Sequence, residues 1–543
     1  MDRRDVLRAG SAALAGVVFG PGRMSVRASE SVVAPTEALA GSAATVVERG
    51  VAELQASMTT GAVTARAVAE AYLARVEAVD RGGPGLNSVI EVNPDALAIA
   101  ETLDRERREG RTRGPLHGIP VLVKDNIDTA DRMRTSAGSL ALASSTAPRD
   151  AFIVERLRAA GAVLLGKTNL SEWANFRSTR STSGWSSRGG QTKNPYALDR
   201  NPCGSSSGSG AAVAASLCAV AIGTETDGSI VCPANACGLV GIKPTVGLVS
   251  RSGIIPISES QDTAGPMART VADAAALLAA IAGSDPRDRA TQRRGAAAPA
   301  DYLAALDANG LKGARLGVVR KMFGRNPSVE RVINEAIDTL RRLGALVVDP
   351  VVVPSQGKYD DAEYQVLLYE FKDGLRKYFA ALGPGAPVTS LADVIAFNDA
   401  HRDRVMPYFG QEIMLEAETK GPLTSPAYRK ARATSRQLAR AGLDAALASH
   451  RLDALVCPTG DPAFPIDLIN GDHYTGGGAS TGPAVSGYPH VTVPAGLVYG
   501  LPVGLSIIGR PWSEATLIRL AYAFEQATKA RRPPVYEASA MLG

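Results

Sequence analysis

The stretch NPCGSSSGSGAAVAAS, residues 201–216, has four serines and three glycines within residues 204–210 and then continues with small residues. A Gly/Ser run is typical of a flexible linker. The residues that follow are small and apolar, however, and favour burial. The stretch therefore predicts a loop fixed against a helix of small residues, with hydroxyl groups at a packed position. Two other segments decide whether these hydroxyl groups have a chemical role: GIPVLVKDN at 118–126 and TETDGSIVCPA at 224–234.

Composition indicates an ordinary globular protein with a large core, because 45% of the 543 residues are hydrophobic and 21% are charged. The formal charge of +5 is spread along the chain, and the densest basic cluster, 287–294, lacks aromatic residues, so nucleic-acid binding is not indicated. Five cysteines are too few to predict a disulfide framework, and whether any of them pair is left open. The five histidines are scattered, so no metal site is expected.

The N-terminus carries a targeting pattern. Paired arginines at Arg3 and Arg4 precede an apolar stretch of twelve residues, which is too short to span a bilayer, and residues 26–28 resemble a small-x-small cleavage site except for the bulky Val26. The pattern resembles a twin-arginine export signal over residues 1–28. We expect a linker at 29–43, a main domain at 44–543, a periplasmic or secreted location, and no membrane association after signal removal.

Helix and strand patterns alternate along the main domain. Thr64 is a good helix N-cap, and residues 327–342 place apolar side chains on one helical stripe between two strand-like segments. This alternation predicts an α/β fold: one large domain with a central mixed, mainly parallel sheet covered by helices on both faces. A mostly helical insertion is expected at about 357–450, where it would shape the substrate cleft.

Two local patterns resemble known motifs but lack their context. GAVLLGKT at 161–168 matches a phosphate-binding loop letter for letter, yet its four central residues are strand-forming, so a buried strand is the better interpretation. GSSSG at 204–208 matches the esterase elbow and would nominate Ser206 with His490, but the preceding residues are polar and contain prolines where that elbow needs a hydrophobic strand.

Lys124 ends an apolar strand, and TETDGS places Ser229 directly after a glycine. A lone lysine at a strand tip normally reaches solvent. If it is buried instead, its charged form is disfavoured, and lowering its pKa from about 10.4 to about 7.5 takes roughly 4 kcal/mol. Gly228 permits a tight turn in which consecutive N–H groups converge on one point, as an oxyanion requires. Together the segments predict a neutral amine beside hydroxyl groups.

Several linked motifs resemble the amidase signature family of serine hydrolases. They are GIPVLVKDN, CGSSSGSGAAVAA, TDGSIVCPA, GLVGIKPTVGLVSRSGIIPIS and SQDTAGPMART, with further matches at 453–535. The resemblance implies a Ser–cisSer–Lys triad in which Ser229 is the nucleophile, Ser205 the bridging serine after a cis peptide bond, and Lys124 the base. It also implies an oxyanion hole formed by the N–H groups of Thr226, Asp227, Gly228 and Ser229, and no cofactor or metal.

Departures from the common family pattern narrow the resemblance. Cys203 and Ser207 replace glycines, and ETDGS replaces DTGGS or DIGGS, which is similar to the bacterial peptide amidase branch. That branch releases ammonia from the C-terminal carboxamide of peptides. Asn175 and Ser206 are candidate substrate-binding residues, although Asn175 would equally suit a structural amide in a loop. We expect a small-molecule or peptide amide as substrate, and a monomer or simple homo-oligomer.

Other functions stay open from the sequence. The same chemistry could act on aryl or short acyl amides. A non-catalytic periplasmic solute-binding protein would match the size and the export signal. A glutamyl-tRNA amidotransferase subunit shares the family motifs, but it works in the cytoplasm with partner subunits, which the export signal opposes.

Overall fold

The fold was analysed in a computed structural model that describes residues 46–293 and 301–541, so the expected signal sequence and linker lie outside the described residues. The large sheet consists of β1 (Val89–Val92), β2 (Pro120–Lys124), β3 (Val163–Thr168), β6 (Val220–Glu225), β7 (Val240–Lys243), β8 (Thr263–Ala268), β9 (Arg315–Val318), β10 (Leu346–Val348), β11 (Ala454–Pro458), β12 (His490–Val498) and β13 (Leu501–Ile508). Its strand order is β1-β3-β2-β6-β8-β7-β12-β13-β11-β9-β10. β4 (Trp185–Ser186) and β5 (Gly190–Gln191) form a separate two-stranded sheet.

The sheet is mixed, as expected, but its parallel part is smaller than the helix–strand alternation predicted. Parallel pairs join β3, β2 and β6 near one edge and β11, β9 and β10 at the other. The strands between them, from β6 to β11, pair antiparallel. β12 and β13 form a hairpin, which sequence alternation alone does not distinguish from two crossover strands.

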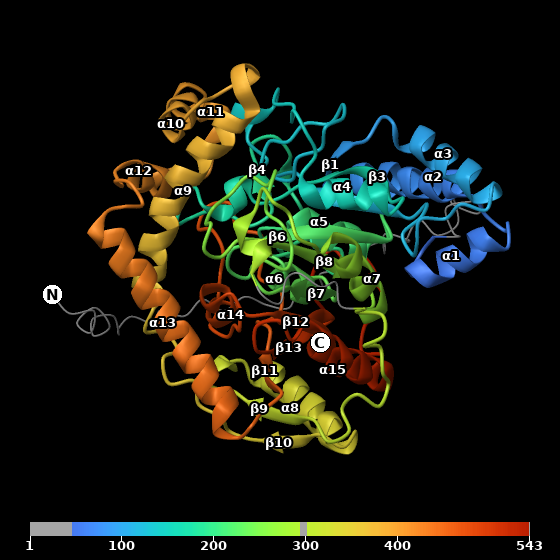
Figure 1. Ribbon diagram of the computed structural model, residues 1–543, viewed down its shortest axis with the longest axis vertical. Coiled ribbons are helices and arrows are strands. Elements are labelled where there is room, and N and C mark those ends of the chain that lie inside the picture. The colour runs from blue at the N-terminus through green and yellow to red at the C-terminus, as the bar shows by residue number, and fades with distance from the viewer. Residues whose placement is uncertain (1–45, 294–300, 542–543) are drawn as a thin grey trace, which may run out of the picture.

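Helices surround this sheet (Figure 1). They are α1 (Val51–Thr59), α2 (Ala65–Arg75), α3 (Ala96–Arg108), α4 (Phe152–Ala159), α5 (Ser207–Ala214), α6 (Val231–Ala236), α7 (Val271–Ile281), α8 (Pro327–Arg342), α9 (Asp360–Leu382), α10 (Leu391–Ala400), α11 (Arg402–Val405), α12 (Glu412–Glu418), α13 (Pro426–Ser449), α14 (Thr481–Ser486) and α15 (Glu514–Thr528). Every residue of β2, β3, β6, β8, β11 and β13 is buried, which requires cover on both faces of the sheet.

The local rules that predicted two helices are visible in the structure. The Thr64 side chain accepts a hydrogen bond from the Ala67 N–H at the start of α2. The apolar stripe of α8 is buried along its length, and α8 connects the parallel pair β9 and β10. The segment 357–450 contains α9 to α13, and its two long helices, α9 and α13, pack against each other along one side of the molecule (Figure 1).

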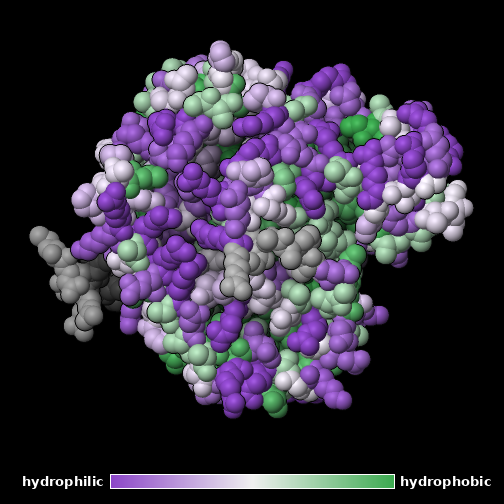
Figure 2. Space-filling view, viewed as in Figure 1, coloured by the Kyte–Doolittle hydropathy of each residue, from purple (hydrophilic) through white to green (hydrophobic). Residues whose placement is uncertain are grey.

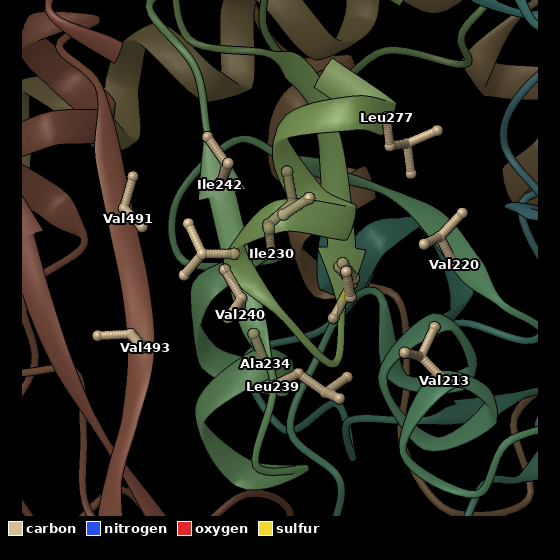
Figure 3. Close-up of a cluster of buried hydrophobic side chains, with 14 of the residues drawn as sticks. Val213, Val220, Ile230, Ala234, Leu239, Val240, Ile242, Leu277, Val491 and Val493 are labelled. Carbon is tan, nitrogen blue, oxygen red and sulfur yellow. The ribbon is translucent and has the colours of Figure 1, made fainter. Parts of the chain in front are cut away.

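The hydrophobic core reaches the segment that carries Ser229. Ile230, the next residue, lies in a buried cluster with Ala234 of α6, Ile242 of β7 and Val491 of β12 (Figure 3). The surface is different: Figure 2 shows a face on which hydrophilic residues predominate and hydrophobic residues are scattered. No helix among the described residues is long and apolar enough to cross a membrane.

Candidate active site

Lys124 is fully buried at the carboxyl end of β2. Its Nζ lies 2.7 Å from the Ser205 Oγ, 2.9 Å from the Thr224 Oγ1 and 3.3 Å from the Thr224 carbonyl oxygen. Burial lowers the pKa of Lys124 to about 7, and the carboxylates of Asp262 and Glu225 oppose only part of that shift. A large share of the Lys124 side chains is therefore neutral at physiological pH.

Ser205 belongs to the loop before α5, and the peptide bond between Gly204 and Ser205 is cis. The helix is pressed closely against neighbouring backbone, because a Cβ on Gly208 would lie 2.3 Å from the Ser88 carbonyl oxygen and 2.5 Å from that of Asn169. Only glycine permits this approach. The Gly/Ser stretch is thus fixed against a small-residue helix, with Ser205 fully buried.

Ser229 lies in the turn between β6 and α6, after Gly228 in the left-handed region (φ +81°). The N–H groups of residues 226–229 donate hydrogen bonds to none of the described residues. The next two N–H groups, of Ile230 and Val231, donate to the Glu225 carboxylate at 2.8 and 3.1 Å. Four consecutive unoccupied donors beside Ser229, a residue that is 8% exposed, could stabilise a developing negative charge.

The two serine loops are joined in two ways. The Ser206 N–H donates to the Ser229 carbonyl at 3.2 Å. Cys203, two residues before Ser205, forms a disulfide with Cys232, three residues after Ser229, with their Cα atoms 5.9 Å apart. The sequence left cysteine pairing open, and the structure forms this one bond within the part of the chain it describes.

The two candidate substrate-binding residues have partners within the protein. The buried Ser206 hydroxyl donates to the Thr224 carbonyl at 3.1 Å and accepts from the Thr224 N–H at 3.2 Å, which gives it a structural role. The Asn175 Nδ2 donates to the Ser183 Oγ at 2.9 Å. The Asn175 Oδ1 is buried and has no partner among the described residues.

The structure separates the two misleading motifs from the site. Residues 163–168 of the phosphate-loop pattern form the buried strand β3, and the Lys167 Nζ donates to the Ile127 carbonyl at 2.6 Å. His490 lies in β12, where its Nε2 is 2.6 Å from the Ser506 Oγ, and burial lowers its pKa to about 3. His490 therefore forms no triad with Ser206, whose hydroxyl is engaged by Thr224.

Two cavities flank the turn before Ser229. One, of about 990 Å³, is lined by Gly204, Asp227 and Gly228, and by the disulfide cysteines. The other, of about 820 Å³, is lined by residues 224–226 and by α9 and α13. The first contains the residues beside Ser205 and Ser229, so it is the cavity from which a substrate would reach them.

Sequence reasoning missed several partners of Lys124. Thr224 bonds the Lys124 Nζ and also accepts from the Asn126 Nδ2 at 3.0 Å. Asp262, whose pKa burial raises to about 6, accepts from the Thr226 Oγ1 at 2.6 Å. Thr224 belongs to the quoted segment TETDGS, so the sequence placed it close to Ser229. No pattern in the sequence places Asp262 near Lys124. Within the described residues, no cluster of three or more His, Cys, Asp or Glu side chains is placed to bind a metal ion.

A buried lysine against a serine, with a second serine beside unoccupied N–H groups, is typical of a serine hydrolase site. A family model described as amidase matches residues 67–518. A probable amidase of Arabidopsis thaliana is 43% identical over 501 residues, covering 90% of this chain and 92% of that protein. A glutamyl-tRNA(Gln) amidotransferase subunit of Chloroflexus aurantiacus is 38% identical over 491 residues, covering 88% of this chain and 96% of that protein.

Solved structures agree with these relatives. The native peptide amidase from Stenotrophomonas maltophilia is 56% identical, with a TM-score of 0.87 over 90% of this chain and 99% of that chain. The peptide amidase PAM in complex with the competitive inhibitor chymostatin is 57% identical, with a TM-score of 0.88 over 90% of this chain and 100% of that chain. The chain belongs to the amidase family, and it is an amidase that hydrolyses carboxamide C–N bonds. The resemblance to bacterial peptide amidase is confirmed.

Proposed function

We propose that the protein removes the C-terminal amide of peptides as ammonia, using Ser229 as nucleophile, Ser205 as proton relay and Lys124 as base. The observation that carries this proposal is the 2.7 Å separation between the Lys124 Nζ and the Ser205 Oγ, at a lysine whose pKa is about 7. A base with this pKa is half neutral near pH 7, where it can accept a proton and return it.

The proposed reaction balances in two halves. The Ser229 oxygen attacks the carboxamide carbon while its proton passes to the Ser205 Oγ and the Ser205 proton passes to the Lys124 Nζ. The tetrahedral intermediate then expels ammonia, which takes a proton back through Ser205, and leaves an acyl group on Ser229. Water attacks the acyl group through the same relay and releases the carboxylic acid.

The free N–H groups of Thr226, Asp227, Gly228 and Ser229 support an oxyanion hole at this turn. No side chain or carbonyl of the described residues occupies them, so their donors are available when the carbonyl oxygen becomes negative. A donor of this kind stabilises the transition state by about 3–4 kcal/mol in serine hydrolases.

The 990 Å³ cavity supports a peptide as the acyl part of the substrate. It has the size of a ligand cavity, and its wall includes Phe464 and Tyr474, whose rings pack edge to face with centroids 5.2 Å apart. Carboxyl groups also gather near the turn, because burial and the neighbouring Asp227 carboxylate raise the pKa of Glu363, and burial together with Asp360 raises the pKa of Asp227. A free C-terminal carboxylate would be repelled there more than a neutral amide.

We further propose that the enzyme acts in the periplasm or after secretion. The twin-arginine-type pattern at residues 1–28 supports this location, and so does the Cys203–Cys232 disulfide, because such bonds persist in oxidising compartments.

The decisive experiment measures ammonia or amine release from four substrates: a peptide amide, its free acid, a peptide anilide and a simple aliphatic amide. We expect the peptide amide to have the highest kcat/KM and the free acid to release no ammonia. Ser229→Ala should reduce kcat by roughly 10⁴-fold or more. Equal or better turnover of the anilide would reassign the substrate to aryl amides. Undiminished turnover by Ser229→Ala would remove the proposed nucleophile.

A further inference from the structure

The residues that line the 820 Å³ cavity include several arginines for which amide hydrolysis gives no role. It is lined by the loop 251–262, by helices α9 and α13, and by residues 224–226. Its lining includes neither Gly204 nor Gly228, which face the other cavity beside the two serines. It is therefore a separate chamber on the side of the catalytic turn where Asp262 lies.

One wall of this chamber is an arginine row, which we define as Arg432, Arg436 and Arg440 of α13. Their spacing of four residues places the three side chains on one face of the helix, and all three line the cavity and are half-buried. Arg293, from a different part of the chain, lines the same cavity. Four guanidinium groups thus border one cavity.

Two members of the arginine row are held by their Nε atoms. The Arg432 Nε donates to the Ser260 Oγ at 3.1 Å, and the Arg440 Nε donates to the Ser486 carbonyl at 2.9 Å. The Nη groups of both side chains donate to none of the described residues. The side chain of Arg436 donates to none of them at all. The guanidinium groups are therefore oriented while their outer donors remain unused.

Carboxylates do not neutralise these arginines. Within the described residues, Arg293, Arg436 and Arg440 form no ion pair, and the shortest approach to a carboxylate is 4.0 Å, from the Arg432 Nε to Glu370. Burial and the neighbouring guanidinium groups lower the pKa of both Arg293 and Arg436, as expected when like charges lack a counter-ion.

Two acidic residues that line the chamber near the arginine row are already engaged. Asp288 binds the Arg251 guanidinium through both oxygens, at 2.6 and 2.8 Å. Glu370 accepts hydrogen bonds from the hydroxyls of Ser258, Ser260 and Tyr428, at 2.5 to 2.6 Å. Nine Lys and Arg residues and seven Asp and Glu residues line the chamber, so positive charge is in excess, and the Nη donors of the arginine row are not used by the described residues.

We infer that this chamber binds a small multiply charged anion, of the phosphate or polycarboxylate class, through Arg293 and the arginine row. Guanidinium groups bind such oxyanions with charge-assisted, often bidentate hydrogen bonds, and several of them around one cavity favour an anion with more than one charge. Since residues 224–226 and Asp262 form part of the wall, an occupant would lie behind the catalytic turn and act on turnover without competing for the substrate cavity.

Isothermal titration calorimetry of the intact enzyme at low ionic strength tests the site directly, with inorganic pyrophosphate and citrate as probes and acetate as the singly charged comparison. We expect saturable binding of both probes and much weaker binding of acetate. Arg436→Gln should weaken probe binding about ten-fold, because it removes charge-assisted hydrogen bonds without removing a contact to the described residues. Arg432→Gln should weaken it as well.

Arg429→Gln is the matched control, because Arg429 lies on the same helix, is exposed and does not line the chamber. Equal losses in Arg429→Gln and Arg436→Gln, or no probe binding by the unmodified enzyme, would overturn the inference. Steady-state kinetics add a second readout: a probe that competes with the peptide amide would show that the chamber belongs to the substrate cleft, which contradicts a separate site. Calorimetry needs no turnover, so failure of the proposed substrate leaves this test intact.

Discussion

The backbone N–H of Ser206 donates a 3.2 Å hydrogen bond to the carbonyl of Ser229, so the loop that carries Ser205 is joined through main-chain atoms to the turn that carries the proposed nucleophile. The Ser206 side chain is occupied elsewhere, by both backbone polar groups of Thr224. Adjacent serines therefore have different tasks: the Ser205 hydroxyl faces Lys124, whereas the Ser206 hydroxyl bonds the strand that supports it.

Substitution of the two serines should separate these tasks. Ser205→Ala should lower kcat by about 10²-fold or more, because the proton relay is lost, with little effect on unfolding. Ser206→Ala should keep most of the turnover but lower the free energy of unfolding by about 1–3 kcal/mol, since Thr224 loses two buried hydrogen bonds. Steady-state kinetics and urea denaturation of both variants measure the contrast. Loss of activity in Ser206→Ala with unchanged stability would instead support a role in substrate binding.

The pH dependence of turnover should report Lys124. A base must be neutral to accept a proton, and the pKa of this lysine is about 7. We expect kcat/KM for a peptide amide to rise with pH through an apparent pKa near 7 and to fall about ten-fold per unit well below it. Profiles measured between pH 5 and 9, over a range in which the protein stays folded, provide the check. A rate that does not change between pH 5.5 and 8 would exclude this lysine as the base.

Lys124 should also affect stability in a pH-dependent way. Its pKa is about 7 in the folded protein and near 10.5 in the unfolded chain, so between these values the unfolded chain binds the extra proton. The wild-type free energy of unfolding should therefore decrease, relative to that of Lys124→Met, by about 2 kcal/mol as the pH falls from 9 to 7.5. Urea denaturation at both pH values measures this slope.

The exposed Lys312 provides the control for that measurement. The difference in free energy of unfolding between Lys312→Met and the wild type should be the same at both pH values, because the Lys312 charge is solvated in the folded and unfolded states alike. If the difference between Lys124→Met and the wild type also stays constant between the two pH values, Lys124 keeps its charge in the folded protein.

The Cys203–Cys232 bond closes a loop with a sequence separation of 29 and joins both serine loops. Replacing both cysteines by serine should reduce the free energy of unfolding by about 3–4 kcal/mol. It should also lower kcat more than it raises KM, because the relative placement of the serines is loosened. Thermal unfolding and kinetics of the double variant, compared with the wild type before and after phosphine reduction, test this. Identical melting and kcat in all three samples would exclude a positioning role.

Local patterns in the sequence predicted those features that depend on neighbouring residues. The apolar run before Lys124 placed this lysine at the end of a buried strand, and the stripe of residues 327–342 predicted α8, because burial repeats with the period of each element. The antiparallel centre of the sheet was not predictable in this way, since helix–strand alternation is also produced by hairpins inserted between crossover units.

Partners that meet only in the folded chain were beyond such patterns. Asp262 reaches Thr226 from the start of β8, and a spacing of 29 residues does not show whether Cys203 and Cys232 lie within bonding distance. The family motifs led to the proposed roles of residues 226–229, but they contain no signal for the arginine row, which α13 contributes from within the helical segment.

The position of the disulfide has a practical consequence for producing the enzyme. A preparation made in a reducing cytosol would carry two free thiols in the wall of the proposed substrate cavity; Cys232 is partly exposed, whereas Cys203, Cys218, Cys237 and Cys457 are buried in the folded protein. Alkylation by a small electrophile, followed by peptide mass mapping, would then label Cys232 in proportion to the immature fraction. The same chemistry would block that fraction's substrate cavity while leaving the oxidised molecules untouched.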